Sequence, residues 1–314
     1  MSASDVGAVR SGYATTSSRR LDFGAVPMRL FEKAERLAWD PLQVDLERDR
    51  EDWAGMVDLQ RDLVLPIAAL FVAGEEAVTL DLLPLVLWAA RTGRLEEEVY
   101  LTSFLHEEAK HTLFFRRWLD QVARATDDLH GYMGTNYRRI FLEELPGAMS
   151  RLLDDGSPAA VARAVVTYSL IVEGVLAETG YHSFRQLLEI QGLLPGLLQG
   201  VGLVARDESR HIRFALYLLR RLIAEDPSLW QVVRGRMDEL VPYALGVQQE
   251  QHRWYLERAR RELGEVPPEF RAMIDMVAED IRTYGQAQVR KRMEALERAR
   301  SAPLAELEAE IEEI

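Results

Sequence analysis

The sequence predicts an all-α protein built as a helical bundle, and three observations support that prediction. Runs of alternating β-branched residues bounded by Asn-Gly or Asp-Gly turns do not occur. Long segments instead repeat apolar residues at helical spacing. Four of these segments are long, apolar on one face and joined by short or moderate connections, which is typical of a bundle. We expect helices over residues 28–38, 47–62, 64–91, 94–124, 136–154, 158–191, 196–224, 227–262 and 268–300.

Glycine, proline and capping residues mark several boundaries of these helices. Gly93 follows the segment that begins at residue 64 and is expected to end it. Ser157 is placed to cap the helix over 158–191, with Pro158 at its first helical position. Pro66 and Pro84 lie inside or at the edge of an apolar helix, so we expect them to kink it.

The predicted helices leave no linker that would separate two domains. We expect a flexible N-terminal tail over residues 1–26, one helical domain over 27–300 and an acidic C-terminal tail over 301–314. The N-terminal stretch has no positively charged start and no apolar core segment, so we expect no secretory signal and a cytoplasmic location. No stretch of about 18 uncharged apolar residues occurs, so we expect no membrane span.

Composition narrows the chemistry. The 314 residues carry a formal net charge of -13, which argues against a nucleic-acid partner. The chain has no cysteine, which excludes disulfides, thiolate metal sites and cysteine nucleophiles. With six histidines in the whole chain, a metal site must depend mainly on carboxylates. Such ligands suit iron, manganese or magnesium better than zinc or copper.

One short pattern occurs twice, as "HEEAKH" over residues 106–111 and "RDESRH" over residues 206–211. Each copy contains Glu-x-x-His, and a Glu and a His three apart on a helix lie on one face and can bind one ion together. A single match means little, because chance alone produces about 0.6 per chain of this composition. Two amphipathic helices with charged, solvated faces would be the alternative interpretation of the pair.

Carboxylates inside apolar runs argue against that alternative. Glu173 lies within "SLIVEGVLA", and Glu75 and Glu76 lie within "LFVAGEEAVTLDLL". A carboxylate buried in such a helix costs several kcal/mol unless it is paired or bound to a cation. Glutamates are almost never fully buried without such a partner. The apolar runs therefore predict ligands in addition to the two Glu-x-x-His motifs.

The spacing of these acids indicates that the two copies of the motif belong to one site. Glu75 precedes Glu108 by 33 residues, and Glu173 precedes Glu208 by 35. The chain therefore carries a lone Glu followed by Glu-x-x-His in each of two halves. Four helices with four carboxylates and two imidazoles form the ligand set of ferritin-like di-iron and di-manganese carboxylate proteins. We therefore predict a ferritin-like four-helix core with extra helices and a site for two metal ions.

The motifs "GEEAVT", "EEAKHTLFF", "IVEG" and "DESRHIRF" resemble the ribonucleotide reductase small-subunit superfamily, over roughly residues 35–260. The family motif alone favours Glu75 over Glu76, because periodicity does not distinguish them. The resemblance implies two metal ions per chain. The ligands that it implies are Glu75, Glu108, His111, Glu173, Glu208 and His211.

Two departures separate this chain from a standard reductase small subunit. Such a subunit stores its radical on a tyrosine four residues after the first ligand histidine, and here that residue is Phe115. Phenylalanine cannot hold a stable phenoxyl radical. The first ligand is also Glu75 where standard subunits usually have Asp. Two groups of the superfamily allow both features: the manganese/iron reductases and the ligand-binding oxidases.

The resemblance favours the ligand-binding oxidases. In that group a valine three residues after the first Glu is joined by an ether bond to a tyrosine five residues before the third, here Val78 and Tyr168. The resemblance implies one manganese and one iron ion, or alternatively two iron ions. It also implies dioxygen as co-substrate, a long-chain fatty acid or similar carboxylate bridging the metals, and a homodimer. Without the family, Val78 and Tyr168 would be interpreted as ordinary core residues.

Residues outside the ligand set have simpler interpretations. Asp207 is a candidate to hydrogen-bond the second nitrogen of a ligand histidine. Glu107 is another candidate, although we expect it to be solvated. We expect the remaining histidines to be surface or packing residues, namely His106, His130, His182 and His252.

Two other functions remain open from the sequence. A manganese/iron ribonucleotide reductase small subunit without a tyrosyl radical would need a docking tail and a path of redox-active aromatic residues, and the acidic C-terminal stretch has no aromatic residue. A non-catalytic bundle that stores iron or binds lipid is the third candidate.

Overall fold

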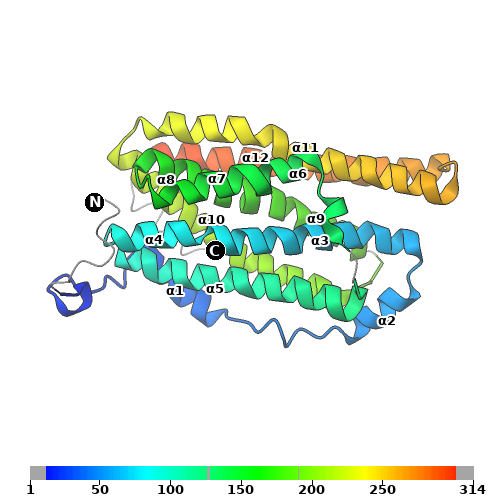
Figure 1. Cartoon of the computed structure of the whole chain (residues 1–314), viewed down its shortest axis with the longest axis horizontal. Coiled ribbons are helices and arrows are strands. Elements are labelled where there is room, and N and C mark those ends of the chain that lie inside the picture. The colour runs from blue at the N-terminus through cyan, green and yellow to red at the C-terminus, as the bar shows by residue number, and fades with distance from the viewer. Residues whose placement is uncertain (1–11, 126–127, 190, 302–314) are drawn as a thin grey trace.

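The computed structural model describes residues 12–125, 128–189 and 191–301, and these residues form helices and no strand. The all-α prediction is therefore confirmed for the described part of the chain. The long helices run roughly along the longest axis of the molecule (Figure 1). The α-helices of eight or more residues are α1 (Val26–Arg36), α2 (Glu47–Gly55), α3 (Asp58–Asp81), α4 (Leu83–Arg91), α5 (Leu95–Trp118), α8 (Pro158–Val165), α9 (Glu178–Leu188), α10 (Pro195–Glu225), α11 (Leu229–Leu263) and α12 (Pro268–Ser301).

Shorter and less regular helices complete the chain. Three segments are π-helical, with hydrogen bonds from each residue to the fifth along the chain. These are η3 (Leu119–Ala123), η5 (Arg139–Glu144) and η7 (Val166–Ala177). The remaining short elements are the α-helices α6 (Thr135–Arg138) and α7 (Leu145–Ser150) and the 3₁₀-helices η2 (Ala14–Thr16), η4 (Leu129–Tyr132) and η6 (Arg151–Leu153).

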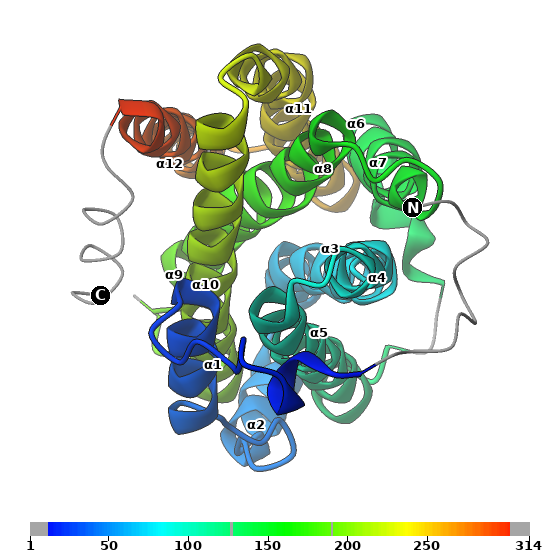
Figure 2. The same ribbon diagram turned by 90° about the vertical axis from the view of Figure 1, so that its left-hand side faces the viewer.

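Four helical segments form the central bundle. They are α3, α5, α10 and the continuous helix that runs through α8, η7 and α9. Viewed from one end, α3 and α5 lie across the bundle from α10 (Figure 2). Outside this core, α1 packs against α5 and α10, while α11 and α12 pack against η7, α9 and α10. This arrangement is the ferritin-like core with extra helices that the sequence predicts.

Some predicted boundaries are correct and others are wrong. The Ser157 side chain accepts a hydrogen bond from the backbone N–H of Ala160, as expected of an N-cap. The prediction of one helix over residues 47–62 is wrong, because α2 ends at Gly55 and α3 begins at Asp58. The expected helix over 64–91 divides after α3, and Pro84 lies in the first turn of α4, where its missing N–H costs no helical hydrogen bond.

The apolar core has two clusters that meet at the middle of the bundle. On α5, Phe104 belongs to one cluster, and Phe114 and Phe115 belong to the other. Glu108 and His111 lie between them on the same helix and are fully buried. The polar layer is therefore closed on both sides by packed apolar side chains, which keep water away from it.

Among the described residues, two helices satisfy the length and composition expected of a membrane span. They are Asp58–Arg91 and Pro158–Leu188. In the most apolar 18-residue stretch of each helix, 50% of the first and 83% of the second is buried inside the fold. The core helices of globular proteins satisfy the same test. The burial of both helices inside the bundle therefore supports their assignment as core helices.

The predicted division into tails and one domain is only partly within the described residues. Residues 1–11 and 302–314 lie outside them. Within the predicted N-terminal tail, the Arg19 guanidinium lies 2.6 Å from the Glu96 carboxylate, and the Asp22 backbone N–H donates to the same carboxylate. This segment therefore contacts the start of α5. The division into two tails and one domain stays a prediction.

Candidate metal centre

The structure brings all six predicted ligands together at the centre of the bundle. Glu75 comes from α3, Glu108 and His111 from α5, Glu173 from η7, and Glu208 and His211 from α10. Each is at most 4% exposed. Four separate helices therefore present four carboxylates and two imidazoles to one buried space.

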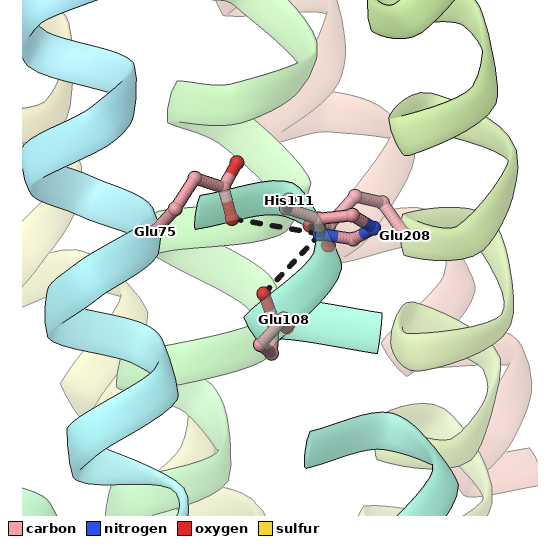
Figure 3. A group of neighbouring side chains, drawn as sticks. All are labelled: Glu75, Glu108, His111 and Glu208. Carbon is pink, nitrogen blue, oxygen red and sulfur yellow. Dashed lines mark ion pairs between the residues drawn. The ribbon is translucent and has the colours of Figure 1, made fainter. Parts of the chain in front are cut away.

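The six side chains divide into two groups that share two members. One group contains Glu75, Glu108, His111 and Glu208, whose ligand atoms all lie within 4.8 Å of one another (Figure 3). The second group satisfies the same criterion and contains Glu108, Glu173, Glu208 and His211. Two adjacent positions with two shared carboxylates are the arrangement expected of a dinuclear site.

The shared carboxylates direct one oxygen to each histidine. Glu108 places Oε2 3.4 Å from His111 Nδ1 and Oε1 3.3 Å from His211 Nδ1. Glu208 places Oε1 3.5 Å from His111 Nδ1 and Oε2 3.3 Å from His211 Nδ1. Both acids are thus oriented to bridge two cations, with one histidine nitrogen at each end.

The two lone glutamates complete the two ends. Glu75 Oε2 lies 3.5 Å from His111 Nδ1, and Glu173 Oε1 lies 3.4 Å from His211 Nδ1. Glu75 is buried whereas its neighbour Glu76 is exposed. Periodicity leaves the choice between these adjacent acids open. The packing of α3 decides it, because it turns Glu75 into the bundle and Glu76 toward solvent.

Several of these buried atoms have no hydrogen-bond partner among the described residues. They are Glu75 Oε2, Glu108 Oε2, both carboxylate oxygens of Glu173, and His111 Nδ1. Leaving buried polar groups unsatisfied costs about 1–3 kcal/mol for each group. Unpaired carboxylate oxygens that converge with an imidazole nitrogen are the donor set that divalent transition metals accept. The residues therefore fit a pair of metal ions.

The pKa values of the ligand carboxylates show how burial and neighbouring charges act on the site without cations. Burial raises the pKa of Glu75 to about 8. Burial and the neighbouring Glu208 carboxylate raise the pKa of Glu173 well above its usual range. Burial opposes ionisation of Glu108 too, but interactions with both ligand histidines outweigh it and lower its pKa to about 2. Without metal, protons take the place of positive charge.

A second layer of acids orients the histidines. His211 Nε2 lies 2.9 Å from Glu107 Oε2, and His111 Nε2 lies 3.3 Å from Asp207 Oδ2. A carboxylate that accepts the Nε2 proton leaves the Nδ1 lone pair directed at the metal positions. The prediction for Asp207 is therefore correct in its contact. The expectation that Glu107 is solvated is wrong, because this residue is only 3% exposed.

Buried cations balance these outer acids. Arg210 contacts Glu107 and lies 2.6 Å from Asp207, and Lys110 lies 3.3 Å from Asp207. The Trp39 indole also donates to Asp207 at 2.6 Å. Burial alone would raise the pKa of Asp207, but its interactions with His111, Arg210 and Lys110 hold that pKa well below its usual range. Asp207 therefore stays ionised.

Sequence reasoning missed Trp39 and the buried role of the two cations. Lys110 and Arg210 occupy the same slot in the repeated pattern, which was the available signal for them. Trp39 lies in the connection between α1 and α2, and no local pattern marks it. The other histidines match expectation, since His106 and His130 are exposed and His182 and His252 are partly buried.

Val78 and Tyr168 lie together beside the site. The Tyr168 hydroxyl donates to the Val78 carbonyl oxygen at 3.0 Å and lies 3.3 Å from Glu108 Oε1. In an α-helix Tyr168 would lie about 140° from Glu173 and would only flank the site. Both residues instead lie in π-helical η7, and Tyr168 lies beside the site. Residues five apart in a π-helix are neighbours along one face.

Phe115 occupies an apolar position on α5. It is fully buried, and its ring stacks on Phe71 with centroids 5.0 Å apart. The position that carries a phenol in standard reductase subunits is therefore filled by packed hydrocarbon.

An apolar cavity adjoins the metal positions. Three candidate ligands line it, namely Glu75, Glu173 and Glu208, and Val78 lies in its wall. The other lining residues are mostly hydrophobic and include Ile67, Leu70, Phe71, Phe141, Val172 and Leu176. The cavity presents a mostly hydrocarbon surface with carboxylates at one end.

The fold and this cluster define a di-metal carboxylate protein of the ferritin-like class. A model of the family "Ribonucleotide reductase, small chain" matches residues 28–295. The chain belongs to this family.

Within that family the chain is similar to solved structures of an R2-like ligand-binding oxidase. The oxidase with aerobically reconstituted Mn/Fe cofactor after a long soak is 38% identical, with a TM-score of 0.83 over 92% of this chain and 98% of that chain. A tyrosine-to-phenylalanine mutant with the same type of cofactor is 37% identical, with a TM-score of 0.82 over 92% of this chain and 99% of that chain. An alanine-to-phenylalanine mutant with anaerobically reconstituted Mn/Fe cofactor is 38% identical, with a TM-score of 0.85 over the same shares.

Proposed function

We propose that this protein is a dioxygen-activating two-electron oxidase with one manganese and one iron ion per chain. Its metal ligands would be Glu75, Glu108, His111, Glu173, Glu208 and His211. The observation that carries the proposal is the pair of buried ligand groups joined by two shared carboxylates, in a chain similar to oxidases with a Mn/Fe cofactor.

Charge supports two divalent ions. The four ligand carboxylates carry four negative charges when ionised, and two divalent cations neutralise them. The outer layer is balanced separately, because Lys110 and Arg210 offset Glu107 and Asp207. Two iron ions would satisfy the same charge balance, so the choice of manganese and iron rests on the similarity to the oxidases.

The residues around the ions have distinct roles. Glu107 and Asp207 hold the histidine rings with Nδ1 toward the metal positions. Phe104 stacks on His211 with centroids 3.5 Å apart and helps to exclude water. When bound, the two ions supply a centre at which dioxygen is reduced. The apolar shell protects that reaction from side reactions with solvent.

We further propose an ether cross-link between Val78 and Tyr168. The phenol loses its O–H hydrogen, the valine side chain loses one C–H hydrogen, and a C–O bond forms. Two electrons and two protons leave the protein, and dioxygen accepts them. The 3.0 Å hydrogen bond from the Tyr168 hydroxyl to the Val78 carbonyl supports this pairing, because it holds the phenol oxygen against the residue that it would join.

The cavity supports a carboxylate ligand with a hydrocarbon chain. A long-chain fatty acid would place its carboxylate at the ions, beside Glu75, Glu173 and Glu208, and its chain along the apolar wall. A homodimer is proposed on the family resemblance alone, and the cytoplasmic location stays a proposal.

Metal analysis and intact mass test the proposed function together. Protein loaded with manganese and iron in air should contain close to two metal ions per chain and lose the mass of two hydrogen atoms. Protein loaded without dioxygen should hold the metals at the unchanged mass. Digestion should then release a peptide pair that carries Val78 and Tyr168. Full metal content with no mass change in air would instead favour a bundle that stores metal without oxidising itself.

One observation favours a second function, a radical-generating manganese/iron reductase subunit. Trp39 is partly buried and donates to Asp207, which in turn contacts His111, so a redox-active indole is linked to the site by hydrogen bonds. This route could carry electrons toward a partner. Nucleotide reduction after addition of a large reductase subunit, with no cross-link formed, would support this function over the oxidase.

A further inference from the structure

The Gln248 side chain on α11 is buried, and neither of its polar atoms has a hydrogen-bond partner in the described part of the chain. It is 8% exposed, and neither its Oε1 nor its Nε2 forms a hydrogen bond with any described residue. A glutamine amide offers two donor hydrogens and two acceptor lone pairs. Buried amides in native structures are nearly always satisfied, so this one calls for a partner from outside the chain.

Gln248 lies where two cavities meet. The first cavity contains the candidate ligands Glu75, Glu173 and Glu208. The second extends toward α12, where Ile274, Val277 and Ile281 line it. Both cavities share the lining residues Ile67, Ser183, Gln248 and Gln251. A ligand that starts at the metals and continues toward α12 therefore passes the Gln248 amide.

The neighbouring helices accommodate this amide without bonding to it. On α12, a Cβ atom added at Gly285 would lie 2.3 Å from Gln248 Nε2 and 2.9 Å from its Oε1. Only glycine leaves that space free. The nearby Ser183 hydroxyl donates to the Thr179 carbonyl at 2.9 Å. The packing thus makes room for an amide but supplies it with no partner.

We propose that Gln248 is a polar subsite that selects a carboxylate ligand with a second hydrogen-bonding group along its chain. This inference rests on the proposed function, which places the carboxylate at the metals. A plain hydrocarbon chain would cover the amide and leave it unsatisfied in a dry site. A hydroxyl, oxo or amide group at that depth would satisfy it. The ligand class is therefore an oxygenated or amidated long-chain acid rather than a simple fatty acid.

Binding of matched acids tests the subsite. The probes are hexadecanoic acid and the series of monohydroxyhexadecanoic acids that differ in hydroxyl position, each titrated into metal-loaded protein. The wild type should bind at least one hydroxy acid about tenfold more tightly than hexadecanoic acid, which is the effect of one net hydrogen bond in a buried site. Gln248→Leu should lose that preference and bind hexadecanoic acid at least as tightly as the wild type.

Gln251→Leu is the matched control. Gln251 lies on the same helix and lines both cavities, but its side chain is only partly buried, so water can satisfy it. This variant should keep the wild-type preference. Metal content and thermal unfolding establish that each variant is folded. If the wild type and Gln248→Leu rank all the acids in the same order, the subsite is wrong while the proposed function stands.

Two further outcomes separate the subsite from the function beneath it. If no acid binds the metal-loaded wild type, the proposed carboxylate ligand fails and the subsite fails with it. Mass spectrometry of ligand extracted from wild-type protein made in cells gives a readout that needs no variant. The extracted ligand should be an acid with an oxygen or nitrogen atom in addition to its carboxylate. Recovery of plain saturated or unsaturated fatty acids alone would overturn the subsite.

Discussion

The two halves of the metal centre carry the same ligands on different backbones. In the first half, Glu75 comes from the regular α-helix α3. In the second half, Glu173 comes from π-helical η7, which also presents Tyr168 to the site. π-Helical segments often occur at functional sites because they bring a fifth residue into register. The second half therefore departs from regular α-helical geometry in the segment that carries the phenol.

The surroundings of the two histidines differ as well. His111 contacts Asp207, which also binds Lys110 and the partly buried Trp39. His211 contacts Glu107, and its ring is covered by Phe104. The first half is therefore linked by polar contacts to the partly buried Trp39. In the second half Phe104 covers the imidazole ring, and Glu107 pairs with the buried Arg210. Two inequivalent positions of this kind suit two different metal ions.

Removal of a shared ligand should have the largest effect, because it breaks both halves at once. Glu108→Ala should reduce the metal content from about two ions per chain to near zero, since Glu108 directs one oxygen to each position. Glu173→Ala should lose about one ion, because Glu173 belongs to one group alone. Metal analysis of the purified variants measures both effects.

Glu76→Ala is the control for this prediction. Glu76 is adjacent to Glu75 but exposed, so its loss should leave the metal content unchanged. Equal metal loss in Glu108→Ala and Glu173→Ala would mean that the two groups do not act as separate positions.

The phenol that distinguishes the second half gives the next prediction. Tyr168→Phe should bind both metals but keep its full mass after aerobic loading, because no phenol oxygen is left to join Val78. Tyr100→Phe removes another fully buried phenol of the same apolar cluster and should still lose two hydrogen atoms. A mass loss in Tyr168→Phe would transfer the cross-link to a different side chain.

Most of the fold and the ligand set follow from the sequence for a simple reason. Helical periodicity, glutamates within apolar runs and the repeated Glu-x-x-His are all local patterns. Five ligands, Glu108, His111, Glu173, Glu208 and His211, can be found from these patterns alone. The structure then brings the two halves together, as the duplicated pattern predicts.

The misses have physical causes as well. Periodicity could not separate Glu75 from Glu76, because adjacent residues in an apolar helix differ only in the direction that tertiary packing gives them. The π-helical turn of η7 has no sequence signal, so the angle between Tyr168 and Glu173 cannot be derived from the sequence. Trp39 and Glu107 act through contacts between distant segments, which no single segment encodes.

The protonation of the metal-free site provides a third prediction, on stability. The folded state keeps a proton on Glu75 up to about pH 8, whereas the unfolded chain releases it near 4.5. The pKa values of His111 and His211 are also raised, by contacts with carboxylates that outweigh burial. The metal-free protein should therefore lose unfolding free energy as the pH rises from about 5 through 8, by about 1.4 kcal/mol per pH unit for each proton retained.

Bound cations replace these protons, so the metal-loaded protein should show a much flatter dependence. Urea unfolding at several pH values, with and without metal, measures the difference. Glu75→Gln should weaken the dependence of the metal-free protein, because a neutral amide has no proton to lose. A metal-free protein that gains stability between pH 6 and pH 8 would contradict the assigned pKa directions.

The outer acids give the smallest expected effect and test the inequivalence of the halves most directly. Asp207→Asn removes a charge that His111, Arg210 and Lys110 all contact, whereas Glu107→Gln removes one that His211 and Arg210 contact. Loss of such a carboxylate weakens metal affinity about 10–100-fold. Asp207→Asn should cause a loss near the upper end of this range, because it leaves Lys110 without a partner charge. The loss should affect the ion bound by the first half. Glu107→Gln should lie at the lower end and weaken the second-half ion.

Competition with a metal-binding dye measures these affinities one ion at a time, and the loss should fall on a different ion in each variant. Asp207→Asn should also slow reduction of the assembled centre by an external electron donor, because it weakens the link from Trp39 to His111. Glu107→Gln should leave that rate unchanged, since Glu107 has no contact with the indole. If the outer acids have a purely structural role, both variants should change metal affinity alone. If only the first half connects the metals to the protein surface, Asp207→Asn should also slow reduction. Equal reduction rates in the two variants would leave the halves different in packing but equivalent in function.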